Sequence, residues 1–127
     1  MIAQILLVED NDDLRRMLRA YLESKNHRVL EALDGAQAFA IAEAELPHLI
    51  IMDIVMPGLY GSSATKQIRE YWKTSNIPII LMSGSVDQSV LGDLLSRPNV
   101  RYLKKPIDLQ VLDDTIKELL PTGGYTV

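Results

Sequence analysis

The 127-residue chain contains no cysteine, which excludes both a disulfide framework and a thiolate metal site. Aromatic residues make up only 6%, and no apolar run approaches the length of a transmembrane helix. The amino terminus has no charged region followed by an apolar signal core, which argues against export. The formal net charge of −4 argues against nucleic acid or an anionic membrane as a direct partner. We therefore expect a cytoplasmic protein.

What the chain does have is a series of short apolar runs, and the central one is LIIMDIVMPG, from Leu49 to Gly58. A short run rich in isoleucine and closed by proline and glycine is typical of a strand buried on both faces of a parallel sheet. Asp53 lies at the carboxyl end of this strand, where open α/β sheets place their ligand sites. An aspartate in a hydrophobic run is costly unless it is compensated, so we expect a partner for it elsewhere in the chain.

Four further apolar runs predict strands, and helical periodicity fills the segments between the strands. The second strand is expected near the sheet edge, because Arg28 and Glu31 interrupt it. Asn11 is expected to cap the first helix, and the inward faces of the first three helices are expected to include Met17, Leu46 and Trp72. The additional strands are predicted at residues 2–8, 27–32, 77–82 and 100–103.

Five strands that alternate with five helices predict an α/β domain with a parallel sheet. A chain of this length forms one domain with a single substantial core. We expect this domain to span residues 1–121, with residues 122–127 as a carboxyl-terminal tail or the start of a linker.

Polar residues follow the strands, and in a parallel sheet they share one edge. Three of them are carboxylates, Glu9, Asp10 and Asp53, which repel one another unless a cation joins them. Oxygen ligands favour a hard ion, Mg²⁺ before Zn²⁺. Ser83 and Lys105 add a hydroxyl and a positive charge, which suit an anion bound beside the metal. These are the groups needed for phosphoryl transfer onto a carboxylate.

The same residues carry a resemblance to a known family. The acidic pair after the first strand, the D-x-x-M-P-G segment from Asp53 to Gly58, Ser83-Gly84 and Lys105-Pro106 occur in the order and spacing of the receiver domains of two-component response regulators. The resemblance covers roughly residues 3 to 120. It implies a flavodoxin-like, doubly wound sheet of five parallel strands in the order 2-1-3-4-5, with five helices.

The resemblance also implies a role for each acidic residue. Asp53 would accept a phosphoryl group from a histidine kinase or a histidine phosphotransfer protein. Asp10, Asp53 and the backbone carbonyl of Val55 would ligate Mg²⁺, while Glu9 would hold a metal-bound water.

The remaining site residues would respond to the phosphoryl group. Lys105 would pair with it, Ser83 would bond one of its oxygens, and Tyr102 would turn inward as the switch residue. The Lys105-Pro106 peptide is expected to be cis.

The function implied by the resemblance is a phosphorylation-dependent signalling switch. Its fourth helix, fifth strand and fifth helix would control a downstream output domain or an effector protein. The domain would not be an enzyme, although it would assist its own Mg²⁺-dependent phosphorylation and slow dephosphorylation. The sequence leaves open whether it is a stand-alone regulator or a part of a larger regulator or hybrid kinase.

Two other functions fit an α/β domain with a strand-end aspartate less well. A haloacid dehalogenase-like phosphatase needs a second carboxylate two residues after its nucleophile, and that position holds Val55. A flavodoxin-like FMN binder needs a Ser/Thr/Gly-rich phosphate loop after the first strand, where this chain has the acidic segment Glu9 to Asp13.

Overall fold

The computed structural model describes residues 3–54, 61–84 and 92–120. All five strands lie in one sheet of order β2-β1-β3-β4-β5, and every neighbouring pair is parallel. The strands are β1 (Gln4–Val8), β2 (Arg28–Ala32), β3 (Leu49–Asp53), β4 (Ile79–Ser83) and β5 (Val100–Lys104). The predicted strand order and the edge position of β2 are therefore confirmed.

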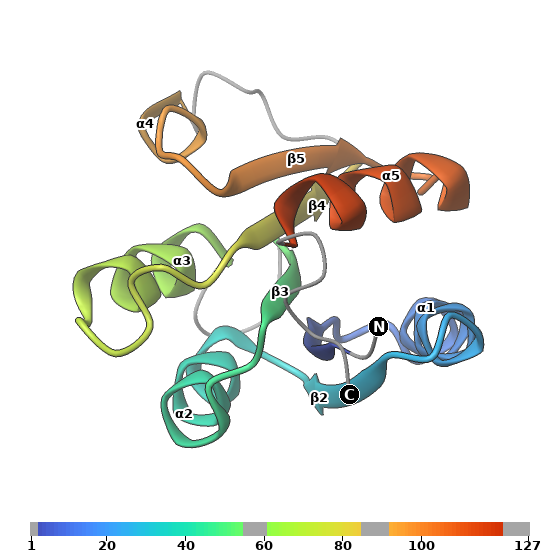
Figure 1. Cartoon of the computed structure of the whole chain (residues 1–127), viewed down its shortest axis with the longest axis horizontal. Coiled ribbons are helices and arrows are strands. Elements are labelled where there is room, and N and C mark those ends of the chain that lie inside the picture. Colours follow the sequence, from blue (N-terminus) through green and yellow to red (C-terminus); the bar gives the residue numbers. More distant parts are fainter. Residues whose placement is uncertain (1–2, 55–60, 85–91, 121–127) are drawn as a thin grey trace.

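Helices cover both faces of the sheet, with α1 and α5 on one side and α2, α3 and α4 on the other (Figure 1). They are α1 (Asp12–Ser24), α2 (Gly35–Glu45), α3 (Gly61–Glu70), α4 (Gly92–Leu95) and α5 (Leu109–Leu119). Within the described ranges, no helix has both the length and the apolar character needed to cross a bilayer.

Strand alternation divides the core into two clusters. In β1, Ile5 and Leu7 pack with residues of α1 and α5, while Leu6 and Val8 pack with residues of α2 and α3. Successive strand residues point to opposite faces of a sheet, so a strand covered on both sides must be apolar throughout. This burial explains the uninterrupted apolar runs, and it fixes the strand ends that carry the polar residues.

Three polar side chains begin helices in the manner that the sequence favours. Asn11 Oδ1 accepts a hydrogen bond from the backbone N–H of Leu14 at 2.9 Å, which confirms the predicted cap of α1. Asp34 caps α2 and Asp108 caps α5 in the same way. The caps of α1 and α5 place both helices directly after segments that carry site residues.

Three side chains expected to face inward are exposed instead. Trp72 is 77% exposed because α3 ends at Glu70. The residue therefore lies beyond the helix on whose inner face the periodicity predicted it. Leu46 is 49% exposed because it adopts the left-handed conformation at the carboxyl end of α2, which turns its side chain off the inner face. Met17 is 42% exposed, while its neighbour Leu18 is fully buried.

His27, just before β2, is half-buried, and its Nδ1 has no hydrogen-bond partner among the described residues. Burial lowers the pKa of His27, and the nearby Asp113 carboxylate on α5 only partly opposes this effect. Above about pH 6.5 the ring is neutral in both the folded and the unfolded chain. Below that pH the unfolded chain binds the proton first, so the free energy of unfolding falls as the pH falls.

We expect His27→Gln to reduce this loss of stability. Urea unfolding of both proteins at pH 8, 7, 6 and 5 measures it, and the variant should gain on the wild type only below about pH 6.5. A difference between the two proteins that stays constant from pH 8 to pH 5 would contradict the prediction.

Candidate functional site

The polar strand ends converge at the carboxyl edge of the sheet. Glu9 follows β1, Asp53 ends β3, Ser83 ends β4 and Lys105 follows β5. Their strands are parallel and β1, β3, β4 and β5 are consecutive in the sheet, so residues nearly a hundred positions apart in sequence become neighbours.

Lys105 is shared between two buried carboxylates. Its Nζ lies 2.8 Å from Glu9 Oε1 and 3.1 Å from Asp53 Oδ2. The side chain of Glu9 is 1% exposed and that of Asp53 is 8% exposed, whereas that of Lys105 is 24% exposed. The partner expected for the strand-end aspartate is therefore Lys105, and the lysine also binds the glutamate.

Burial and charge shift the ionisation of this group of residues. Burial raises the pKa of Glu9, although hydrogen bonds from Lys105 Nζ and from the Asn11 backbone N–H act against this rise. For Lys105, burial lowers the pKa, but the hydrogen bonds and charges of Glu9 and Asp53 outweigh it, so its pKa is raised. Lys105 consequently stays protonated and remains a cation at the centre of the site.

Glu9, Asp10 and Asp53 form one carboxylate cluster, which we call the acidic cluster. One carboxylate oxygen from each lies within 4.8 Å of the others. Glu9 and Asp53 are buried and Asp10 is exposed, so the cluster opens to solvent on one side. An oxygen-only set of this kind fits Mg²⁺ and does not favour Zn²⁺. Val55, whose carbonyl was predicted as a further ligand, lies outside the described residues.

Contacts that the sequence patterns did not predict hold Glu9 in place. Its backbone carbonyl accepts a hydrogen bond from Arg15 Nη1 at 2.9 Å, and its Oε2 accepts one from the backbone N–H of Asn11 at 3.1 Å. Arg15 also pairs with Asp12 and Glu31. The only sequence signal for Arg15 was its spacing of three residues from Asp12, which indicates a helical ion pair and not a site residue.

The Ser83 backbone links β4 to β5 beside the site. Its carbonyl accepts hydrogen bonds from the Tyr102 hydroxyl at 2.9 Å and from the Lys105 backbone N–H at 3.0 Å. Ser83 is 2% exposed, and Tyr102 packs against the core cluster on the α2 and α3 side. The Lys105-Pro106 peptide is cis, as predicted. The structure thus brings together every described residue that was predicted for the site.

Comparison with known proteins identifies the family. The model of the response regulator receiver domain matches residues 5–117. The chain belongs to this family. Its receiver domain is 40% identical over 120 residues to the protein PilH of Pseudomonas aeruginosa, covering 94% of this chain and 98% of PilH. It spans only 52% of a longer relative, the transcriptional regulatory protein AfsQ1 of Streptomyces coelicolor, at 32% identity over 94% of this chain.

Solved receiver structures share the fold of this receiver domain. The chemotaxis response regulator CheY4 of Vibrio cholerae superposes with a TM-score of 0.85 at 25% identity, covering 94% of this chain and all of that one. The receiver domain of the sensor histidine kinase PA1611 of Pseudomonas aeruginosa has a TM-score of 0.79 at 33% identity, covering 94% of this chain and 98% of that one. The latter structure holds a magnesium ion coordinated in its active-site cleft.

Membership of the receiver family decides between the signalling switch and its two alternatives, a phosphatase and an FMN binder. The receiver domain is a phosphorylation-dependent signalling switch of two-component systems, and not a phosphatase or an FMN binder. Receiver domains bind Mg²⁺ in an acidic site and work with histidine kinases and with output or effector partners.

Proposed function

We propose that Asp53 accepts the phosphoryl group from a phosphohistidine of a sensor kinase or phosphotransfer protein. The observation that carries this proposal is the position of its carboxylate at the end of β3, 3.1 Å from the Lys105 ammonium and within the acidic cluster. One Asp53 carboxylate oxygen forms the bond to phosphorus while the bond from phosphorus to the donor imidazole breaks, and the imidazole keeps the electron pair.

Asp10 and Asp53 would ligate Mg²⁺ together with the carbonyl of Val55, and Glu9 would hold a metal-bound water. When bound, the ion supplies positive charge that neutralises the phosphoryl oxygens during transfer. Lys105, whose Nζ lies 3.1 Å from Asp53 Oδ2, would add a second positive charge. Two carboxylates and one carbonyl leave several waters on Mg²⁺, so we expect weak binding.

The switch would operate because the phosphoryl group competes with Glu9 for Lys105 and also attracts the Ser83 hydroxyl. A phosphoryl group on Asp53 carries about two negative charges. These charges would draw the Lys105 ammonium away from Glu9. The Ser83 hydroxyl would donate to a phosphoryl oxygen, and because the Ser83 carbonyl holds both Tyr102 and the Lys105 backbone, its movement reaches β5. The surface of α4, β5 and α5 would then control an output domain or an effector protein.

Several finer points stay predictions. These are the domain limits of 1–121 with a tail or linker at 122–127, the cytoplasmic location, and the slow self-dephosphorylation expected from an apolar side chain at Val55. The segment 122–127 and Val55 both lie outside the described residues.

Incubation with acetyl phosphate and Mg²⁺ tests the phosphoacceptor. Intact mass should show one added phosphoryl group on the wild type and none on Asp53→Asn. Asp113→Asn is the matched control, because Asp113 is a buried aspartate on α5 paired with Lys117, and this variant should be phosphorylated like the wild type. A phosphoryl group retained by Asp53→Asn, or absent from the wild type, would overturn the proposal.

A further inference from the structure

Asp10 differs from the other two members of the acidic cluster in how it is held. Glu9 and Asp53 are buried, and both bind the Lys105 ammonium. Asp10 is exposed and follows Glu9 beyond the end of β1, where the hydrogen bonds of the sheet no longer fix the chain. The position of its carboxylate therefore depends on the backbone on either side of it.

Arg15 holds that backbone on both sides of Asp10. Its Nη1 donates to the carbonyl of Glu9 at 2.9 Å, and this carbonyl belongs to the peptide that joins Glu9 to Asp10. Because a peptide is planar, a bond to its oxygen fixes the orientation of the whole unit. On the other side of Asp10, the backbone N–H of Arg15 donates to the carbonyl of Asn11 at 2.9 Å. Asp10 thus lies between two carbonyls that accept hydrogen bonds from one residue.

The Arg15 guanidinium is itself held in one orientation. Its side chain is only 12% exposed, and its Nη2 pairs with Asp12 of the same helix. Its Nε lies 3.6 Å from Glu31 Oε1 on β2, the strand beside α1 (Figure 1). A guanidinium is a rigid planar fork, so two carboxylates that hold two of its nitrogens direct the third at the Glu9 carbonyl. The contact with Glu9 links this pair of surface carboxylates to the acidic cluster.

The sign of the Arg15 charge separates two possible roles. A positive charge near the acidic cluster repels Mg²⁺ and weakens its binding. If Arg15 acted through its charge alone, its replacement by a neutral residue would tighten the binding of the ion. If Arg15 places a ligand of the ion, the same replacement would weaken the binding.

We propose that Arg15 is a positioning residue for Mg²⁺ binding, which holds the Glu9-Asp10 peptide so that the Asp10 carboxylate lies beside Glu9 and Asp53 before the ion arrives. This inference rests on the proposed ligation of Mg²⁺ by Asp10. Groups that orient a metal ligand without touching the metal commonly change metal affinity about 10- to 100-fold. A bound ion would itself hold Asp10, so the loss of Arg15 acts mainly on affinity.

Mg²⁺ titration of the ¹⁵N-labelled protein, without a phosphodonor and at constant ionic strength, tests the proposal through the amide shifts of residues 9, 10 and 53. Arg15→Gln should raise the dissociation constant about tenfold. The Asp10 amide nitrogen should also shift in the metal-free variant, because its peptide has lost a hydrogen bond. With acetyl phosphate, the Mg²⁺ concentration for half-maximal phosphorylation should rise by the same factor, while the rate at saturating Mg²⁺ should change little. A purely structural role would lower stability and leave the dissociation constant unchanged.

Two further variants complete the test. Arg19→Gln is the matched control, because Arg19 lies one turn later in α1 and carries the same charge, but it pairs with Glu31 and Glu23. Its replacement should not weaken Mg²⁺ binding. Arg15→Lys keeps the charge and the stem but not the planar fork, so it should still weaken binding at least about threefold. This variant decides the question if Arg15→Gln gives no folded spectrum.

The outcomes separate this inference from the proposed function on which it rests. Mg²⁺ affinity that is unchanged or higher in either Arg15 variant, or lowered just as much in Arg19→Gln, would overturn the role of Arg15 and leave the metal site in place. Asp10→Asn is titrated in the same way. If it binds Mg²⁺ like the wild type, Asp10 is not a ligand, and the role proposed for Arg15 fails with it.

Discussion

Asp10→Asn should slow Mg²⁺-dependent phosphorylation by acetyl phosphate about 100-fold, which corresponds to about 2.7 kcal/mol of transition-state stabilisation. Asp10 is the exposed member of the acidic cluster and one of the carboxylates proposed to ligate Mg²⁺. An amide keeps the shape of the side chain and one oxygen but removes the charge that a hard cation needs. The measurement is the initial phosphorylation rate, by intact mass, over a series of Mg²⁺ concentrations.

Asp13→Asn is the matched control for this prediction. Asp13 is also exposed and lies in the first turn of α1, but it does not belong to the acidic cluster. Its replacement should leave the rate and its Mg²⁺ dependence unchanged. If Asp10→Asn is phosphorylated at the wild-type rate, Asp10 is not a metal ligand. Without Mg²⁺, the same variant should be no less stable than the wild type, since one repulsive charge has been removed.

The part of the site that could be predicted from the sequence follows from strand geometry. Glu9, Asp53 and Ser83 each stand at the end of an apolar run, and parallel strands bring such ends to one edge whatever the detailed packing. The family motif then selected Lys105 as the lysine of the site. The fold is predictable for the same reason, because buried parallel strands are marked by continuous apolar runs.

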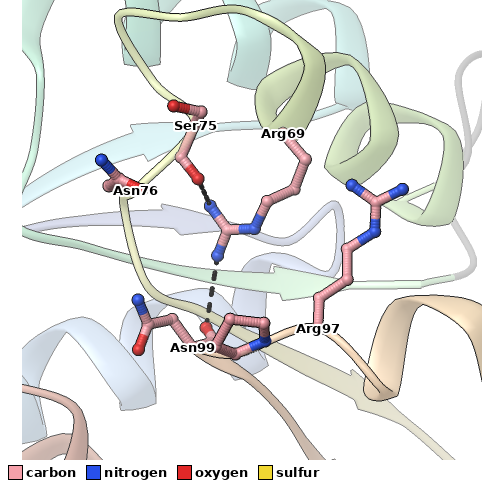
Figure 2. A pocket seen from close by; sticks show the side chains of 6 residues that line it. Arg69, Ser75, Asn76, Arg97 and Asn99 are labelled. Atoms are coloured by element: carbon pink, nitrogen blue, oxygen red, sulfur yellow. Dashed lines mark hydrogen bonds between the residues drawn. The ribbon is translucent and has the colours of Figure 1, made fainter.

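What could not be predicted depends on where side chains and helices end in space. The sharing of Lys105 between Glu9 and Asp53 is a matter of side-chain length and rotamer, which no spacing encodes. Trp72 was placed on an inner helical face because periodicity does not show that α3 stops at Glu70. The cavity lined by Arg69, Ser75 and Asn99 lies between two loops that precede different strands, so its residues form no pattern within either loop (Figure 2).

Lys105→Met should reduce the free energy of unfolding by about 3 kcal/mol when measured with urea in EDTA. Methionine keeps the volume of the lysine stem, so the loss arises from the charge and not from a cavity. Without the ammonium group, Glu9 and Asp53 face each other as buried carboxylates with no cation between them. Arg101→Met is the control, because Arg101 and its partner Glu118 are 41% and 60% exposed, and the loss of this pair should change stability little.

The stronger test is the sign of a second substitution. Glu9→Gln alone should destabilise the protein, because it breaks the 2.8 Å ion pair with Lys105. In the Lys105→Met background the same change should stabilise it, since it removes one of two repelling charges and offers an amide donor to Asp53. The Gln side chain can still accept the hydrogen bond from the Asn11 N–H, so the position of the residue is kept. A double-mutant cycle measures this reversal directly. If Glu9→Gln has the same effect in both backgrounds, Lys105 does not hold the two carboxylates together, and the competition proposed for the switch has no physical basis.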